Sequence, residues 1–349
     1  MPGHPQVRPV RIVSTGMALP TRCVTSLELD ERLRLAPGTI EARCGVRRRY
    51  FAERETSAQL AATACESALA RSGGLHWDDV DCLIAANATM DQALPYNAAL
   101  VHAELGLHAR RTSTFDVGAS CLSFLAAVDF AGYMLQAGRY RNVMVVSTDL
   151  ASVGLDWNDL ETCGMFGDGA AAALLTRAQS DMGTETDEGS AILAARFETL
   201  SDGVDFCKIP AGGSRYHPGK VEGRDFMELN LFKMRGKPLF RLMAAEIPAF
   251  IHKLLDNAGM RHQGGLSSLA RIIPHQASRL GLSHMMKRLQ IPAHQFTDII
   301  ADYGNQVAAS LPTALHLTLT SQSPPRRGDT MMLIGTSAGV SMGGMIVRY

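Results

Sequence analysis

Short apolar runs alternate with longer amphipathic segments along almost the whole chain. The short runs, rich in Val and Ile and bounded by Gly, Pro or Asp, predict strands at 10–14, 82–86, 113–117, 143–147, 271–273 and 331–335. The longer segments have apolar residues near helical spacing and predict helices at 57–71, 122–137, 240–258, 280–289 and 307–320. Strands that alternate with helices predict an α/β fold whose sheets are largely covered.

The two halves of the chain resemble each other weakly. FGDG at 166–169 leads into the apolar run 170–175, and GTSAG at 335–339 leads toward the apolar run 342–347. This pattern indicates a duplication with a boundary near 177–189, where the sequence turns polar. Because α/β proteins commonly repeat strand–glycine–strand patterns, coincidence remains the alternative.

Composition excludes several classes of protein. Lys and Arg together number 34, as do Asp and Glu, so the basic excess of a nucleic-acid-binding protein is absent. Seven scattered cysteines without a CxxC pair disfavour a disulfide framework and a zinc ribbon, and they fit a reducing cytoplasm. The N-terminus has no apolar signal region, and no apolar run is long enough to span a bilayer. We therefore expect a cytoplasmic protein that binds neither nucleic acid nor membrane.

One cysteine lies where a strand pattern meets a helix pattern. Cys121, in FDVGASCLSF, follows the predicted strand 113–117 and precedes the predicted helix 122–137. The N-terminal end of a helix offers a partial positive charge and free N–H groups, and both lower the pKa of a thiol toward the reactive thiolate. Cys121 is therefore a candidate nucleophile, with a buried inert cysteine as the alternative.

Two more polar residues occupy similar junctions. His275, in IIPHQAS, ends a strand pattern and opens a helix pattern, where open α/β sheets present functional groups. A core or capping histidine is the alternative. Asn305, in YGNQVAAS, is either a plain helix N-cap or an amide donor to an oxyanion.

A thiol, an imidazole and an amide around one pocket would suit acyl transfer followed by carbanion formation. The acyl group would rest on Cys121, while His275 and Asn305 would bond the carbonyl that gathers charge as a malonyl group loses carbon dioxide. No HExxH or P-loop motif offers a competing chemistry, and we expect neither a metal nor a redox cofactor.

Together these three segments resemble the β-ketoacyl-(acyl carrier protein) synthase III family of the thiolase superfamily. MFGDGAAAALL at 165–175 and GTSAGVSMGG at 335–344 also match, and weaker matches lie at 12–16 and 43–47. The resemblance implies a thiolase-like, duplicated five-layer α/β/α/β/α fold, usually as a homodimer. It also implies an acyltransferase of fatty acid biosynthesis that uses coenzyme A or acyl carrier protein thioesters.

The same resemblance assigns roles to residues. Cys121 would be the acylated nucleophile in an N-terminal half, 1–177, and His275 and Asn305 the decarboxylation pair in a C-terminal half, 178–349. The backbone N–H groups of Cys121 and Gly339 would form the oxyanion hole.

Leu94 falls where the family places a large apolar residue that crosses the dimer and limits the partner's acyl pocket. Leucine in place of phenylalanine indicates room for a longer or branched chain, and ordinary interface packing is the alternative. Four basic residues on or beside helices near the site could dock an acidic carrier protein, or they could form a solvated helix face: Arg241, Arg279, Lys287 and Arg288.

The sequence departs from the family at three places. A tryptophan and an arginine that clamp the adenine of coenzyme A are replaced by Thr39 and, near the second position, Leu160, which favours a carrier protein or a looser thioester as donor. The family's HQAN reads HQAS, and Ser278 can cap a helix as well as asparagine does. Cys44 replaces a threonine, and we attach no function to it.

Two other functions stay open. A specialised relative could condense acyl chains without decarboxylation, or transfer an acyl group to oxygen or nitrogen in secondary metabolism. A non-catalytic partner that binds acyl carriers is a third hypothesis, which the presence of Cys121 disfavours.

Overall fold

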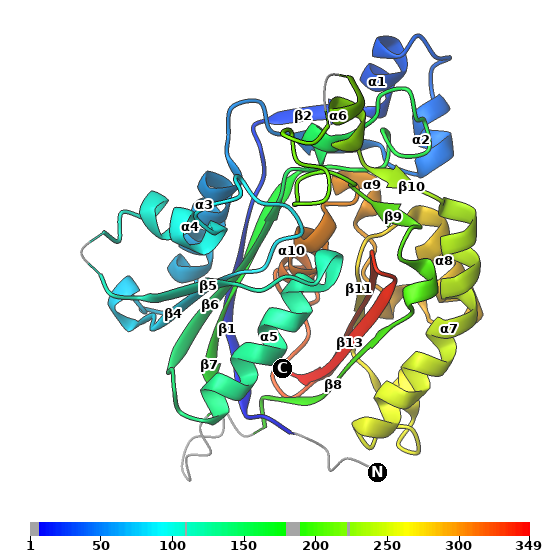
Figure 1. The fold of residues 1–349 in the computed structure, drawn as a ribbon. Coiled ribbons are helices and arrows are strands. Elements are labelled where there is room, and N and C mark those ends of the chain that lie inside the picture. Colours follow the sequence, from blue (N-terminus) through cyan, green and yellow to red (C-terminus); the bar gives the residue numbers. More distant parts are fainter. Residues whose placement is uncertain (1–6, 109, 179–188, 222–223) are drawn as a thin grey trace.

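The computed structural model describes residues 7–108, 110–178, 189–221 and 224–349. Two sheets stand face to face at its centre, with helices between and outside them (Figure 1). The first sheet has the strand order β5–β4–β6–β7–β1. These strands are β1 (Val10–Ala18), β4 (Cys82–Ala85), β5 (Ser113–Asp116), β6 (Asn142–Asp149) and β7 (Gly169–Arg177).

The second sheet repeats this order. Its strands are arranged β11–β12–β13–β8, with β8 (Ala191–Thr199), β11 (Arg271–Pro274), β12 (Thr330–Ser337) and β13 (Ser341–Arg348). The second sheet has no full counterpart of β5 among the described residues. In its place a single parallel bridge joins Phe296 to Ile272 of β11, as β5 pairs with β4 in the first sheet. The parallel and antiparallel pairs also correspond, so the fold is a duplication. The polar segment between the halves, 179–188, lies outside the described residues.

The helices complete five α/β/α/β/α layers. Helices α3 (Ser57–Ala70) and α4 (Asn97–Glu104) cover the outer face of the first sheet. Helices α7 (Gly236–Asn257) and α8 (Arg279–Arg288) cover the outer face of the second. Between the sheets lie α5 (Ser123–Gln136) and α10 (Ser310–Leu319), and α5 contacts strands of both sheets. The expected fold class is therefore confirmed.

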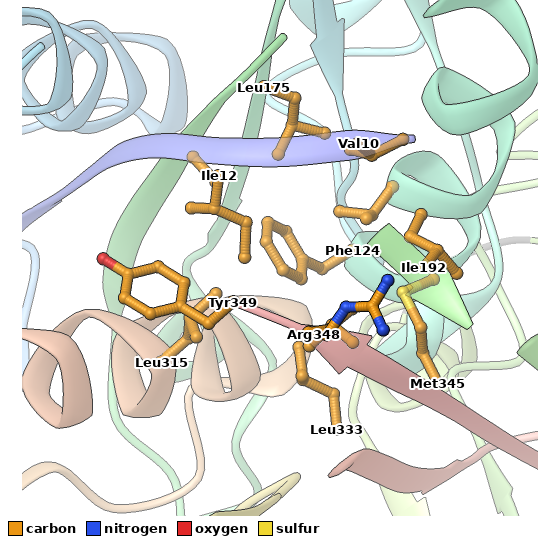
Figure 2. A pocket seen from close by; sticks show the side chains of 13 residues that line it. Val10, Ile12, Phe124, Leu175, Ile192, Leu315, Leu333, Met345, Arg348 and Tyr349 are labelled. Carbon is orange, nitrogen blue, oxygen red and sulfur yellow. The ribbon is translucent and has the colours of Figure 1, made fainter. Parts of the chain in front are cut away.

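The middle layer is closely packed. Figure 2 shows side chains from both sheets around Phe124 of α5, among them Ile12 of the first sheet and Met345 of the second. The void that these side chains line has a volume of about 20 Å³. This volume is about that of one water molecule, so it is a packing gap and no ligand site.

Smaller elements gather at the top of Figure 1, at one end of the sheets. They are β2 (Arg22–Thr25), α1 (Ser26–Arg32), α2 (Thr39–Cys44), β3 (Arg48–Phe51), β9 (Cys207–Lys208), α6 (Arg224–Leu229), β10 (Lys233–Met234) and α9 (Ile300–Tyr303). Apolar side chains of β2, α1, α2, β3 and β10, such as Leu29 and Ile40, form a separate small core with loop residues such as Phe166.

Every strand and helix expected from the sequence is present, with ends that differ by a few residues. Sequence patterns did not predict β8 or α4. Among the described residues no helix is long and apolar enough to cross a membrane.

Candidate active site

The backbone around Cys121 forms a tight turn that leads from β5 into α5. Residues Ser120–Leu122 make one 3₁₀ turn, and Ser120 has a φ of +50°, in the left-handed region that few side chains adopt. The turn is held by the hydroxyl of Ser123, which accepts the N–H of Ala119 at 2.8 Å and bonds the carbonyl of Ser120 at 2.7 Å. Cys121 thus stands at the N-terminal end of a helix of the middle layer.

The thiol of Cys121 does not have the lowered pKa that its position predicts. Burial, with smaller contributions from the nearby Asp149 and Cys207, raises the pKa to about 12. The N–H groups of Ala338 and of Cys121 itself lower it, but by less than burial raises it. The expectation of a lowered pKa is therefore wrong for the protein without substrate, because desolvation outweighs the helix end.

His275 follows β11 directly and is 4% exposed. The backbone N–H of His275 donates to the carbonyl of Ile334 at 2.7 Å, and this bond extends the pairing of β11 with β12 by one residue. Burial lowers the pKa of His275 to about 4, so the imidazole is neutral near pH 7. Within the described residues Nδ1 is buried and has no hydrogen-bond partner.

Asn305 is fixed at both ends of its amide. Its Oδ1 accepts the N–H of Val307 at 2.9 Å, and its Nδ2 donates to the carbonyl of Ala277 at 3.2 Å. Asn305 is therefore a cap for the turn Val307–Ala309, and that turn leads into α10. The cap uses only one of the two Nδ2 hydrogens, so the second can serve a substrate oxygen.

The three residues are brought together by short contacts. A Cβ placed on Gly335 would lie 2.8 Å from Cβ of His275 and 3.0 Å from Cδ2 of Leu122, the neighbour of Cys121. Only a glycine lets these two segments approach so closely. Asn305 joins the group through Ala277, which lies two residues after His275. The segments that carry Cys121, His275 and Asn305 are thus neighbours in the structure.

Sequence reasoning missed Asp149, which faces Cys121 from the end of β6. It is fully buried and accepts four hydrogen bonds, from Ala88, Thr89 and Ala308. A charged residue at the end of the buried run VMVVSTD was the available signal, because parallel strands present functional groups at their carboxyl ends.

Comparison with known proteins decides the family. The family model for 3-oxoacyl-[acyl-carrier-protein (ACP)] synthase III matches residues 115–203, and the model for its C-terminal part matches 255–349. A β-ketoacyl-[acyl-carrier-protein] synthase III of Cereibacter sphaeroides is 32% identical over 343 residues, 97% of this chain and 99% of the relative. The chain belongs to the 3-oxoacyl-(acyl carrier protein) synthase III family.

Solved structures agree with this assignment. The 3-oxoacyl-[acyl-carrier-protein] synthase III of Aquifex aeolicus is 28% identical, with a TM-score of 0.84 over 97% of this chain and 100% of that one. The priming β-ketosynthase of the R1128 polyketide biosynthetic pathway is 26% identical, with a TM-score of 0.85 over 99% and 97% of the two chains. The family is one of acyl-transferring enzymes, so this chain is an acyltransferase.

Gly339 lies in the turn between β12 and β13, with a φ of +134°. The N–H of the preceding residue, Ala338, acts on the sulfur of Cys121, which places this family turn against the nucleophile. Leu94 lies in the loop before α4, and its side chain is 83% exposed.

The four basic residues lie on two adjacent helices. Arg241 is exposed on α7, and Arg279, Lys287 and Arg288 are exposed on α8. The two helices contact each other, and Phe240 stacks edge-on against His284 between them. Arg279 also pairs with Asp298 at 2.6 Å. Ser278 accepts the N–H of Gly281 at 3.1 Å and so caps α8, as expected.

The positions of the expected adenine clamp hold other contacts. The hydroxyl of Thr39 bonds the carbonyl of Ala36, and Leu160 packs in the small core at the top of the molecule. A different cation–aromatic pair lies on this end: the guanidinium of Arg32 stands 4.1 Å from the ring centre of Trp157.

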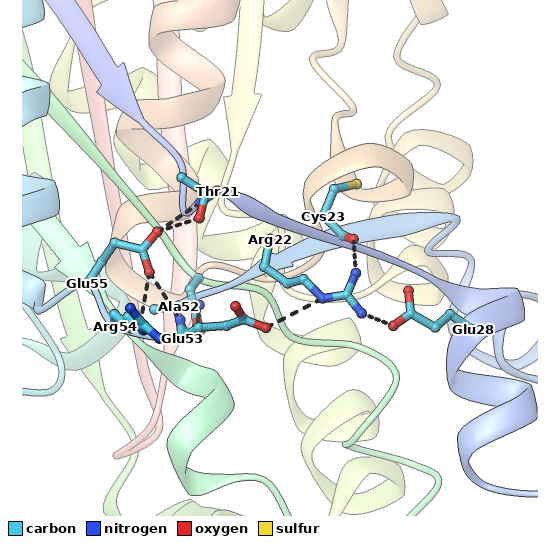
Figure 3. Close-up of polar contacts among 9 residues, drawn as sticks. Thr21, Arg22, Cys23, Glu28, Ala52, Glu53, Arg54 and Glu55 are labelled. Carbon is cyan, nitrogen blue, oxygen red and sulfur yellow. Dashed lines mark hydrogen bonds and ion pairs between the residues drawn. The ribbon is translucent and has the colours of Figure 1, made fainter.

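Both members of that pair line a surface pocket of about 360 Å³. Figure 3 shows one wall of this pocket, where Arg22 bonds Glu28 and pairs with Glu53. Among the described residues no group of His, Cys, Asp and Glu could hold a metal ion.

Proposed function

We propose that this chain is a 3-oxoacyl-(acyl carrier protein) synthase III that condenses an acyl thioester with a malonyl thioester. The contacts that join the segments of Cys121, His275 and Asn305 support the proposal most directly: Gly335 lies against His275 and Leu122, and Asn305 bonds Ala277. Family membership over nearly the whole chain supports the same reaction.

In the first step the sulfur of Cys121 attacks the carbonyl carbon of an acyl thioester. The carbon–sulfur bond to the carrier breaks, and the proton of Cys121 goes to the released thiol. The N–H groups of Cys121 and Gly339 would receive the oxyanion of the tetrahedral intermediate. Because burial holds the pKa of Cys121 high, the thiol loses its proton only as the donor binds.

In the second step a malonyl thioester loses carbon dioxide. The bond between the carboxylate carbon and the α-carbon breaks, and charge gathers on the thioester oxygen. A neutral His275 and the free Nδ2 hydrogen of Asn305 would donate to that oxygen. The α-carbon then attacks the acyl carbon on Cys121, the bond from that carbon to sulfur breaks, and the sulfur leaves as a thiolate that takes a proton from solvent. No metal or redox cofactor enters the scheme.

The donor is best identified by intact-protein mass spectrometry with acyl-coenzyme A and acyl-carrier thioesters of several chain lengths. We expect an acyl mass on the wild type that Cys121→Ala lacks, and carbon dioxide release when malonyl carrier protein follows. An acylated acceptor without carbon dioxide would favour the specialised acyl-transfer function. Absence of any acyl mass would favour the non-catalytic one.

We also propose a homodimer through the β5 edge of the first sheet. Three apolar side chains beside this edge are exposed: Met90, Leu94 and Tyr96. The hydroxyl of Tyr96 bonds Thr114 of β5, so the loop and the edge strand form one surface. In such a dimer Leu94 would reach the partner's acyl pocket. A mass twice that of the chain in light scattering would support the dimer, which Leu94→Asp should weaken.

The exposed basic residues of α7 and α8 would dock the acidic carrier protein. Replacing Lys287 and Arg288 together by Glu should raise the KM for malonyl carrier protein and leave kcat nearly unchanged. An equal loss with coenzyme A thioesters would contradict docking.

A further inference from the structure

The carboxylate of Asp149 ties three segments of the site together. Its Oδ1 accepts the N–H of Ala88 at 3.0 Å, the N–H of Thr89 at 2.7 Å and the hydroxyl of Thr89 at 2.8 Å. Its Oδ2 accepts the N–H of Ala308 at 2.9 Å. Asp149 itself ends β6, so one buried side chain links the first sheet, the loop after β4 and the turn Val307–Ala309.

The bond to Ala308 supports a strained backbone. Val307 has a φ of +52°, which a β-branched residue adopts only when its surroundings hold it there. The N–H of Val307 donates to Asn305, and the N–H of Ala308 donates to Asp149. These two bonds hold the backbone on either side of the strained Cα, and the first of them also orients the amide of Asn305.

A negative charge suits this place. The turn Val307–Ala309 runs directly into α10, so the carboxylate lies at the N-terminal end of a continuous helical segment. Burial raises the pKa of Asp149 to about 7, and the four donors oppose that rise. Cys121 is the titratable group that faces Asp149 across this space.

We propose that Asp149 is a positioning residue for the decarboxylation step, which fixes the Val307–Ala309 turn and thereby the amide of Asn305. The inference rests on the proposed function, since it assigns the residue to one of the two half-reactions. Asp149 touches no substrate; it acts through Ala308 and Asn305.

Asp149→Asn tests the inference, because the amide keeps the shape of the side chain but turns one acceptor into a donor that faces N–H groups. We expect release of radiolabelled carbon dioxide from malonyl carrier protein to fall about tenfold to hundredfold. At pH 8 we expect alkylation of Cys121 by iodoacetamide to rise about threefold, because a nearby negative charge has been removed. General damage to the fold would slow both reactions.

Asp168→Asn is the matched control. Asp168 is also fully buried and its carboxylate accepts three bonds, from Ala52 and Ser152, and within the described residues it bonds neither the Ser120–Leu122 turn nor the Val307–Ala309 turn. Only its backbone carbonyl, which the substitution keeps, bonds Gln306. Asp168→Asn should lower the free energy of unfolding, while the ratio of the rates of the two half-reactions stays that of the wild type. If Asp149→Asn does not fold, Thr89→Val removes one donor and should slow decarboxylation about threefold to tenfold.

Equal losses in both half-reactions, or unchanged decarboxylation, would overturn the positioning role. A wild type that takes an acyl group but releases no carbon dioxide would instead overturn the proposed function, and the two failures are therefore distinguishable.

Discussion

Two turns of this molecule have nearly the same backbone and opposite surroundings. Ser120–Leu122 leads into α5, and Val307–Ala309 leads into α10. Each turn begins with a residue of positive φ, at +50° and +52°. In each, the N–H before the turn donates to the hydroxyl of the first helical serine, Ser123 at 2.8 Å or Ser310 at 2.7 Å. The duplication therefore extends to the hydrogen bonds of the site.

The difference lies in what the opposite half presents. Cys121 and Ala308 are the middle residues of the two turns. Cys121 meets the N–H of Ala338, which follows β12 of the second half, whereas Ala308 meets the carboxylate of Asp149, which ends β6 of the first. The sulfur of Cys121 thus has a backbone N–H donor as its partner, and the N–H of Ala308 has a carboxylate acceptor. Residues of both halves therefore meet at the candidate site.

The largest effect should come from exchanging the middle residues. Cys121→Ala should abolish acyl loading, a loss of about 10³-fold or more. Adding Ala308→Cys to this variant should restore nothing, because the N–H of Ala338 that favours a thiolate acts on Cys121, whereas the carboxylate of Asp149 is bonded to residue 308 itself and opposes a thiolate there. Intact-protein mass spectrometry with the preferred donor measures both. An acyl mass on the double variant would show that the two turns are chemically equivalent.

The second turn should matter to the second half-reaction alone. Asn305→Ala removes the free amide hydrogen and the cap on Val307, and carbon dioxide release should fall about 10²- to 10³-fold. Acyl loading on Cys121 should change by less than about threefold, because the first turn has its own hydroxyl support. A parallel loss of loading would mean that the two turns are mechanically coupled.

Sequence patterns predicted the architecture well because it depends on local periodicity. Buried strands such as 143–147 are continuous apolar runs, and the helices between them carry apolar residues at regular spacing. They missed β8, whose apolar residues are mixed with Arg196 and Glu198, a pair that bonds on the surface of the strand. Such a strand resembles a polar loop when only its composition is considered.

The site was predictable only in part. The motifs around Cys121, His275 and Asn305 have specific residues in specific contexts, and family resemblance connected them. The pKa of Cys121 was not predictable, because burial is a property of the assembled layers rather than of the segment. Asp149 was missed for the same reason, since its four donors come from residues at least 60 positions away in sequence.

The pH dependence of the two half-reactions should differ. With a pKa of about 12 at Cys121, the thiolate fraction and the alkylation rate should rise about tenfold per pH unit from 7.5 to 9. Carbon dioxide release by Cys121→Ala should change by less than about twofold over this range, because His275 with a pKa of about 4 is already neutral and Asp149 with a pKa of about 7 is already mostly charged. An alkylation plateau near pH 7 would contradict the high pKa of Cys121.

The smallest effect on the two half-reactions should come from Gly335 of β12, which packs against Leu122 of the first half. In the duplicated first half, the position that corresponds to Gly335 is Ser147 of β6. A side chain fits there because the residue beside Ser147 is the small Ala86, whereas the residue beside Gly335 is His275. Gly335→Ala would press a methyl group against His275 and Leu122, and it should cost about 1–3 kcal/mol of unfolding free energy.

Both half-reactions of Gly335→Ala should slow by about threefold to tenfold, since the added methyl displaces the imidazole and the nucleophile turn together. Thermal unfolding and the two assays measure these effects, with Gly213→Ala as the control because a Cβ there meets nothing within 4 Å. If acyl loading slows and decarboxylation does not, the added methyl group displaces Leu122 and the nucleophile turn, while His275 keeps its position.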